Sequence, residues 1–209
     1  VVLSTPAIAG GRAFIPAWGP SVSAVDVQSG AVAWTWVPPD SGAPRAGTTG
    51  VAVGGDTVYV TGWTWLNASG TDTRQWLVAL SAAAGSQIWR VELNEPVQFV
   101  SVVAPPVVSG GVVTLTTNVV GKMLVFDRDN GAPLWSTPPP GGGASSLNFG
   151  PVAAGDTIFW PSGDGAVEAR LARNGALLWR WTDVGSPARL AVTRNRVYAS
   201  VGATLLVID

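Results

Sequence analysis

The chain has 209 residues, of which 47% are hydrophobic and only 12% are charged, and its formal net charge is −1. Soluble domains carry about 25% charged residues, so this chain is expected to rest against another molecule, and its charge draws neither nucleic acid nor an anionic membrane. It holds no Cys and no His, which excludes thiolate nucleophiles, disulfides, the usual zinc sites and histidine bases.

A hairpin pattern recurs five times along the chain. Each copy is a short apolar run, a two-residue turn and a second run rich in β-branched or aromatic residues. The copies are AIAGGRAFIPA (7–17), VAVGGDTVYVTG (51–62), VVSGGVVTLTT (107–117), VAAGDTIFWPS (152–162) and AVTRNRVYAS (191–200). Glycine supplies the positive φ that tight hairpin turns require, and in the fifth copy, which has Arg194-Asn195 instead, Asn tolerates the same region. Each copy is therefore predicted to form two antiparallel strands.

A second pattern follows the first four hairpins. Its copies are SAVDVQSGAVAWTW (23–36), VALSAAAGSQIWRV (78–91), LVFDRDNGAPLWST (124–137) and EARLARNGALLWRW (168–181). Each contains Gly, three residues and then Trp, and the Gly is expected to close a turn between a third and a fourth strand. Two hairpins per repeat predict a four-stranded antiparallel sheet, and repeated sheets of this size are typical of a β-propeller.

The second pattern resembles a known family motif. Ala24-x-Asp26-x-x-Ser29-Gly30-x-x-x-Trp34 is similar to the tryptophan-docking motif of pyrroloquinoline-quinone-like propellers, A-x-D-x-x-T-G-x-x-x-W, and the later copies match it more loosely. The resemblance implies an all-β propeller of four-stranded blades. It also implies that four Trp are structural and wedge between adjacent blades: Trp34, Trp89, Trp135 and Trp179.

The repeats predict one propeller domain or fragment over residues 1–209. Its blades are expected at about 5–37, 48–93, 103–138, 149–182 and 188–209, and the fifth copy ends before its own Trp strand. A chain that continues beyond this sequence is favoured over a compact five-blade ring. The apolar stretch 96–121 contains Pro105-Pro106 and Gly110-Gly111, which fit strands and a turn better than a membrane helix, so no transmembrane segment is predicted.

The second repeat carries an insertion. Between Tyr59, the large residue that each repeat has in its second strand, and the turn of its Gly-x-x-x-Trp segment, it holds about ten residues more than the other repeats. The extra segment GWTWLNASGTDTRQ (62–75) is predicted to be a loop, with Trp63, Trp65 and Asn67 as candidate interaction residues. Exposed Trp concentrates binding energy; the alternative is that both Trp fold back over the edge of the blade. Asn67-Ala68-Ser69 is also a formal glycosylation sequon.

No constellation of catalytic residues is found, and no cofactor or metal site is predicted. Asp127-Arg128-Asp129-Asn130-Gly131 falls on a repeat turn and lacks the distal Glu of a calcium loop. The nearest paired carboxylates, Asp164 and Glu168, are expected to be solvated. In the resembled enzymes the quinone lies between a Trp and adjacent cysteines near calcium, and this chain has no Cys.

The leading interpretation is therefore a non-catalytic scaffold that binds proteins, as part of a larger assembly, similar to the scaffold lipoprotein of the outer-membrane barrel-assembly machinery. Two alternatives stay open. One is a fragment of a quinone-dependent dehydrogenase propeller, and the other is a propeller that binds a glycan through its aromatic residues. The family resemblance alone implies a location outside the cytoplasm.

Overall fold

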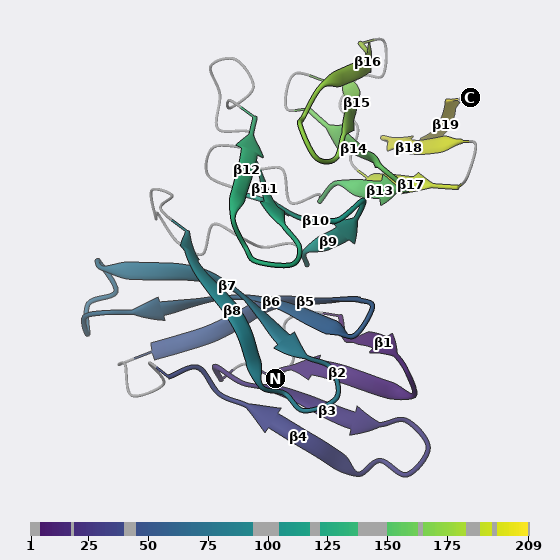
Figure 1. The fold of residues 1–209 in the computed structure, drawn as a ribbon. Helices are drawn as coiled ribbons and strands as arrows, with labels where there is room; N and C mark the ends of the chain where they lie inside the picture. The colour runs from purple at the N-terminus through teal and green to yellow at the C-terminus, as the bar shows by residue number, and fades with distance from the viewer. Residues whose placement is uncertain are drawn as a thin grey trace. The chain divides into compact units, whose positions relative to one another are not determined.

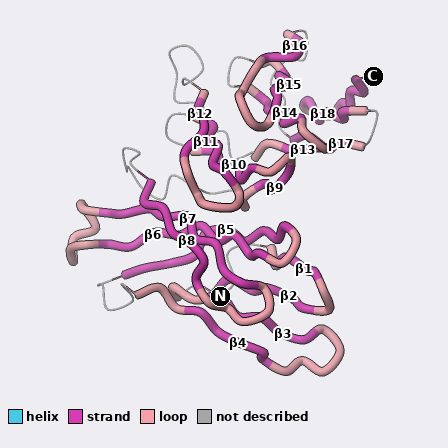
Figure 2. The backbone as a smooth tube through the Cα atoms, in the orientation of Figure 1, coloured by secondary structure: helices cyan, strands magenta, loops and turns pink. Residues whose placement is uncertain are grey.

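The structure is a computed structural model that describes residues 5–17, 19–39, 45–93, 105–117, 122–137, 150–162, 165–182, 189–193 and 196–208. All regular elements within these ranges are β-strands (Figures 1 and 2). The described residues therefore offer no helix that is long and apolar enough to cross a membrane. The chain divides into two compact units, Val1–Pro106 and Val107–Asp209.

The first unit contains two antiparallel sheets of four strands, which we call blades 1 and 2. Blade 1 consists of β1 (Ala7–Ala9), β2 (Arg12–Pro16), β3 (Val22–Asp26) and β4 (Val32–Trp36). Blade 2 consists of β5 (Arg45–Gly54), β6 (Thr57–Trp65), β7 (Thr73–Ser81) and β8 (Gln87–Leu93). In both sheets each strand pairs with the strand that follows it in the sequence.

The second unit contains blades 3, 4 and 5. Blade 3 consists of β9 (Val107–Ser109), β10 (Val112–Thr116), β11 (Met123–Asp127) and β12 (Pro133–Ser136). Blade 4 consists of β13 (Val152–Ala154), β14 (Thr157–Pro161), β15 (Val167–Leu171) and β16 (Leu177–Trp181). Blade 5 has three strands, β17 (Arg189–Val192), β18 (Val197–Val201) and β19 (Thr204–Ile208). The predicted all-β class, with five repeats and an incomplete fifth, is confirmed.

Glycine and a short polar side chain shape the turns of these blades. Gly10 and Gly11 have φ of 56° and 74°, the left-handed values that a two-residue hairpin turn needs. In the turn between β3 and β4, the Asp26 carboxylate accepts the backbone N–H groups of Gln28 and Ser29 at 3.1 and 2.8 Å. These bonds and the Ser29 hydroxyl lower the pKa of Asp26. We call this third-to-fourth-strand connection the docking turn of a blade.

Apolar faces of neighbouring blades pack against each other within each unit. In the first unit, Phe14, Val22 and Trp36 of blade 1 meet Val60 and Trp76 of blade 2 in one buried cluster. In the second unit, the blade 3 residues Val112, Met123 and Val125 meet the blade 4 residues Ile158, Trp160 and Ala172. A further cluster joins Val167 of blade 4 to Leu190, Val197 and Ala199 of blade 5. Each fully buried aliphatic side chain of this kind contributes about 1.5 to 3 kcal/mol.

Candidate functional site

Blade 2 differs from the other blades in the length of its strands. Its first three strands have 10, 9 and 9 residues, whereas the first three strands of the other blades have 3 to 5. We call the additional part, residues 45–49, 61–65 and 73–76 with the connection 66–72, the blade 2 extension. The outward ends of β6 and β7 form this longer hairpin in Figure 1.

The prediction that Trp63 and Trp65 lie in a loop is wrong. Both are on β6 and are paired with Gln75 and Thr73 of β7, so that only residues 66–72 connect the two strands. Val, Tyr, Thr and Trp along β6 are residues that favour strands, and they occur on both sides of Gly62. The insertion therefore lengthens the sheet, and it places the two Trp side chains on the same face of one strand.

The opposite face of the blade 2 extension is structural. Trp76 is fully buried, its indole N–H donates to the Thr64 hydroxyl at 3.2 Å, and its ring meets Trp36 of blade 1 edge to face at 5.7 Å. A Cβ on Gly62 would lie 2.3 Å from the Trp76 ring. Glycine at position 62 therefore makes room for the indole that holds the extension to blade 1.

Trp63 and Trp65 form a half-buried pair whose ring centroids are 5.8 Å apart. A Cβ on Gly47 would be 3.1 Å from three ring atoms of Trp63, so that indole lies over the neighbouring strand β5. The guanidinium carbon of the exposed Arg45 is 5.0 Å from the centroid of Trp65, within the range of a cation–π contact. The pair is thus held in place by the extension while part of each ring stays accessible.

Asn67 closes the tip of the extension. Its side-chain oxygen accepts the backbone N–H groups of Thr71 and Asp72 at 3.1 and 3.3 Å, and its amide nitrogen donates to the Thr71 hydroxyl at 2.8 Å. Leu66, the neighbouring residue, is 41% exposed. These contacts give Asn67 a structural task in the turn, and they leave Leu66 as the apolar side chain that the tip presents to solvent.

The described contacts of Trp34 and Trp135 repeat one geometry. The indole N–H of Trp34 donates to the carbonyl oxygen of Ala82 at 3.0 Å, and that of Trp135 donates to Ala172 at 2.8 Å. Each acceptor lies in the docking turn of the following blade. Cβ atoms on Gly85 and Gly175, in the same turns, would lie 2.6 and 2.7 Å from the Trp34 and Trp135 rings.

The motif glycine therefore has a second task that sequence reasoning missed. Besides its positive φ, the absence of a side chain admits the Trp ring of the preceding blade. The regular pairing of Gly with Trp in every motif copy was the available signal. The other two motif Trp also contact an aromatic ring of their own blade, Trp89 at 5.8 Å from Tyr59 and Trp179 at 5.9 Å from Phe159. Trp179 packs in addition against the buried cluster that joins blades 4 and 5.

Glu168 is not solvated, contrary to the prediction. It lies on β15, and its carboxylate contacts Arg170 Nε at 2.8 Å and Arg180 Nε at 3.2 Å, with 10% of its side chain exposed. Glu168 is paired across the strands with Trp160, which belongs to the buried cluster of blades 3 and 4. The other predicted carboxylate, Asp164, lies outside the described residues. Glu168 is thus a carboxylate held between two cations within blade 4.

The residues do not fit the quinone site that the family resemblance implies. The sequence contains no Cys to cover a quinone, and within the described ranges no three acidic side chains group into a cation site.

One protein-family model matches most of the chain. The family model described as outer membrane protein assembly factor BamB matches residues 19–209. The chain belongs to this family. No curated protein matches this BamB-family chain in sequence.

Three solved structures are similar to the BamB-family chain. BamB from Moraxella catarrhalis is 17% identical, with 99% of this chain and 82% of that chain covered and a TM-score of 0.42. The quinohemoprotein alcohol dehydrogenase of Comamonas testosteroni is 17% identical over 95% of this chain and 40% of its own, with a TM-score of 0.64. The quinohemoprotein alcohol dehydrogenase ADHIIG of Pseudomonas putida HK5 is 16% identical over 99% and 38%, with a TM-score of 0.63.

The chain spans less than half the length of these two dehydrogenases. At 16 to 17% identity, the similarity to these two dehydrogenases shows the propeller fold alone. It assigns no activity to this chain, because one fold can carry many functions.

Proposed function

We propose that this chain is a non-catalytic propeller scaffold that binds proteins outside the cytoplasm, with the blade 2 extension as a contact surface. The observation that carries the proposal is the extension itself, since among the described blades only blade 2 has it and it presents Trp63, Trp65 and Leu66 at its outer end. The family description, an assembly factor for outer membrane proteins, supports both a protein partner and an extracytoplasmic location.

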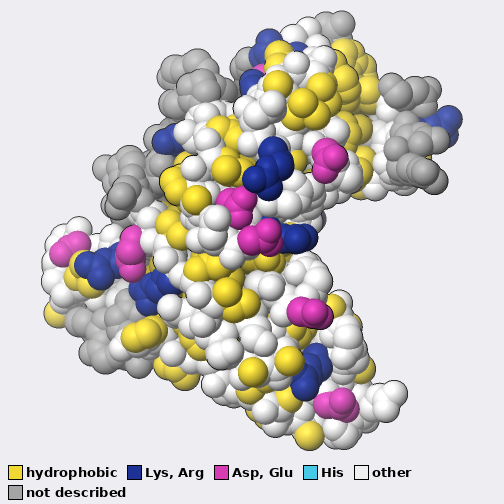
Figure 3. All heavy atoms as spheres, in the orientation of Figure 1, with side chains coloured by type: hydrophobic (Ala, Val, Ile, Leu, Met, Phe, Trp, Pro, Cys, Tyr) yellow, Lys and Arg dark blue, Asp and Glu magenta, His cyan; other side chains and the backbone are white. Residues whose placement is uncertain are grey.

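The chemistry of the extension suits a protein interface. Trp and Arg supply a disproportionate share of binding energy at interfaces, and here Trp65 already contacts both Trp63 and Arg45. Side chains that are ordered before binding lose less conformational entropy when the complex forms. The low charge of the chain fits the same purpose, and on the face shown in Figure 3 charged side chains are scattered among uncharged and apolar ones.

Replacing Leu66 with Asp is expected to weaken partner binding at least about tenfold, because it replaces the exposed apolar side chain of the tip with a charge and leaves the packed Trp side chains in place. The partner is first identified by a photo-crosslinking residue at position 66, and its affinity for purified variants is then measured by calorimetry. The Trp63→Ala/Trp65→Ala double variant is expected to lose more. The matched control is Ile88→Ser, on β8 of the same blade, where Ile88 is 52% exposed.

Equal affinity for the parent chain, the Leu66→Asp variant and the Trp double variant would contradict the assignment of this surface. Two further measurements separate the alternatives. Binding on a glycan array that disappears with Trp63→Ala would favour a glycan as the ligand. A higher melting temperature with calcium and pyrroloquinoline quinone together would favour the dehydrogenase alternative.

A further inference from the structure

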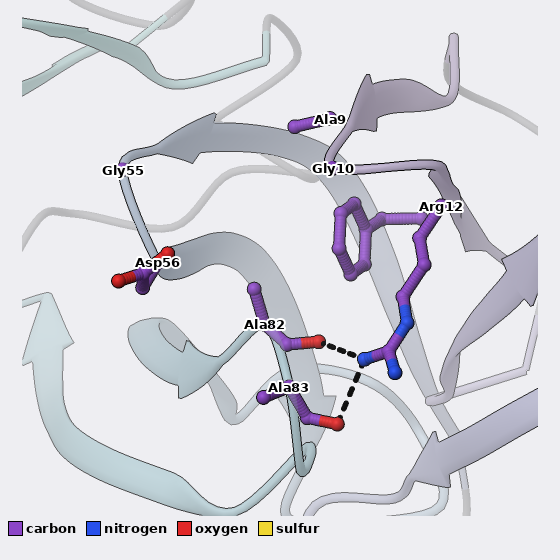
Figure 4. A pocket seen from close by; sticks show the side chains of 8 residues that line it. Ala9, Gly10, Arg12, Gly55, Asp56, Ala82 and Ala83 are labelled. Carbon is purple, nitrogen blue, oxygen red and sulfur yellow. Dashed lines mark hydrogen bonds between the residues drawn. The ribbon is translucent and has the colours of Figure 1, made fainter.

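A hollow of about 240 Å³ lies between blades 1 and 2, beside the hairpin turn at Gly10 (Figure 4). Ala9 and Phe14 of blade 1 and Ala82 and Ala83 of blade 2 give it apolar walls. Asp56 and Arg12 are its charged lining residues and lie on opposite sides of Ala82 (Figure 4). None of these residues belongs to the blade 2 extension.

The corresponding place between blades 3 and 4 is closed. There the Ser109 hydroxyl donates to the carbonyl oxygen of Gly155 at 2.7 Å. A Cβ on Gly110 would lie 3.0 Å from the Ala172 side chain and 3.1 Å from Asp156, whereas a Cβ on the aligned Gly10 would meet nothing within 4 Å. Ala9 aligns with Ser109 and lacks the hydroxyl that ties the two turns together. The hollow therefore comes from the particular residues of blades 1 and 2, and the repeat alone does not produce it.

Arg12 forms one flank of the hollow, and part of its donor capacity is already used. Its Nη1 donates to the carbonyl oxygens of Ala82 and Ala83 at 2.7 and 2.8 Å. Arg12 is also paired across the strands with Asp26, so a carboxylate stands beside the guanidinium. An anionic ligand would have to compete with these groups, which argues against an anion site.

Asp56 forms the other flank and offers a free acceptor. It is exposed, and among the described residues its carboxylate makes no hydrogen bond and no ion pair, although its backbone oxygen accepts the N–H of Ala82 at 2.9 Å. An exposed carboxylate beside apolar walls is complementary to a cation on an aliphatic stem. Lysine has this form, since its ammonium is a compact charge at the end of four methylene groups, whereas the guanidinium of Arg is a wide plane.

We propose that this hollow is a binding site for a lysine side chain of a partner molecule. The alkyl stem lies along the part-exposed side chains of Ala9 and Ala82, and the ammonium group pairs with Asp56. The site is separate from the contact surface proposed above, and its test needs no knowledge of the partner.

The test is an NMR titration of the full chain with Nα-acetyl-lysine methylamide, followed through backbone amide shifts. We expect saturable shifts at Gly10, Gly55, Asp56, Ala82 and Ala83, with a dissociation constant on the order of millimolar. The Nε-acetylated probe and the norleucine analogue keep the stem but carry no charge, and both are expected to produce no saturable shifts there.

Substitutions at the hollow, including two that copy residues of the junction between blades 3 and 4, test the role of each lining residue. Asp56→Asn is expected to weaken binding about fivefold, and Ala9→Ser/Ala83→Arg, which copies Ser109 and Arg173 of blades 3 and 4, is expected to abolish it. The matched control Asp156→Asn leaves binding unchanged. Equal shifts with the neutral probes, unchanged affinity in Asp56→Asn, or no shifts at the hollow at tens of millimolar lysine probe would each overturn the proposal.

Discussion

Truncation of Trp135 to Ala is expected to lower the free energy of unfolding of the second unit by about 3 kcal/mol, the low end of the range for a large aromatic side chain because the ring is only half buried. The variant removes the ring that lies against Gly175 and the indole N–H that donates to Ala172 at 2.8 Å. Urea unfolding followed by circular dichroism measures the loss. This prediction tests the proposed docking role of the motif Trp.

Trp135→Phe separates the two contributions, since it keeps a ring in the docking turn but has no N–H to donate. We expect it to cost about 1 kcal/mol for the hydrogen bond, plus the smaller loss of packed area. Trp34→Ala is the parallel variant in the first unit, where Ala82 and Gly85 take the places of Ala172 and Gly175. If Trp135→Ala were as stable as the parent chain, the docking role would be refuted.

Replacing Glu168 with Gln is expected to destabilise the chain by about 3 kcal/mol, because it leaves Arg170 and Arg180 without their carboxylate in a site that is largely closed to water. The Arg side chains are 22% and 35% exposed and the Glu side chain 10%, so the cost falls at the low end for a buried ion pair. The measurement is the midpoint and slope of urea unfolding at pH 7.

Glu92 provides a matched control for Glu168. It also lies between two arginines, Arg74 and Arg90, each at 3.1 Å, but 42% of its side chain is exposed. Solvent screens such pairs, so Glu92→Gln is expected to cost less than about 1 kcal/mol. Equal losses for the two variants would show that burial does not set the strength of the Glu168 contacts.

The repeating part of the fold could be predicted from the sequence because it depends on local rules. The turn at Gly10-Gly11 and the four Gly-x-x-x-Trp segments each have one favoured local structure, and the repetition identified the architecture. The same logic predicted an incomplete fifth repeat, and the described residues of blade 5 form three strands. Positive φ at glycine and alternation along strands are properties of short segments, and they need no knowledge of distant contacts.

The features that set one blade apart depend on contacts between segments that are distant in the sequence. The insertion in blade 2 contains polar residues and Gly62, which favour a loop when they are considered alone. In the structure Gly62 receives the ring of Trp76 and the strand continues. Likewise, the sequence predicts a solvated carboxylate at Glu168, because it does not show that Arg180 of β16 lies opposite in the sheet and pairs with it. The hollow beside Asp56 becomes visible only when two junctions are compared in space.

Hydrogen–deuterium exchange of the chain with and without its crosslinked and then purified partner tests the proposed scaffold function most directly. We expect slower exchange on binding in residues 61–76, which cover the outer part of β6, the tip and the start of β7. Residues 87–93 on β8 of the same blade are expected to keep their exchange rates. Unchanged exchange over 61–76, together with protection elsewhere, would contradict the assignment of the blade 2 extension as the contact surface.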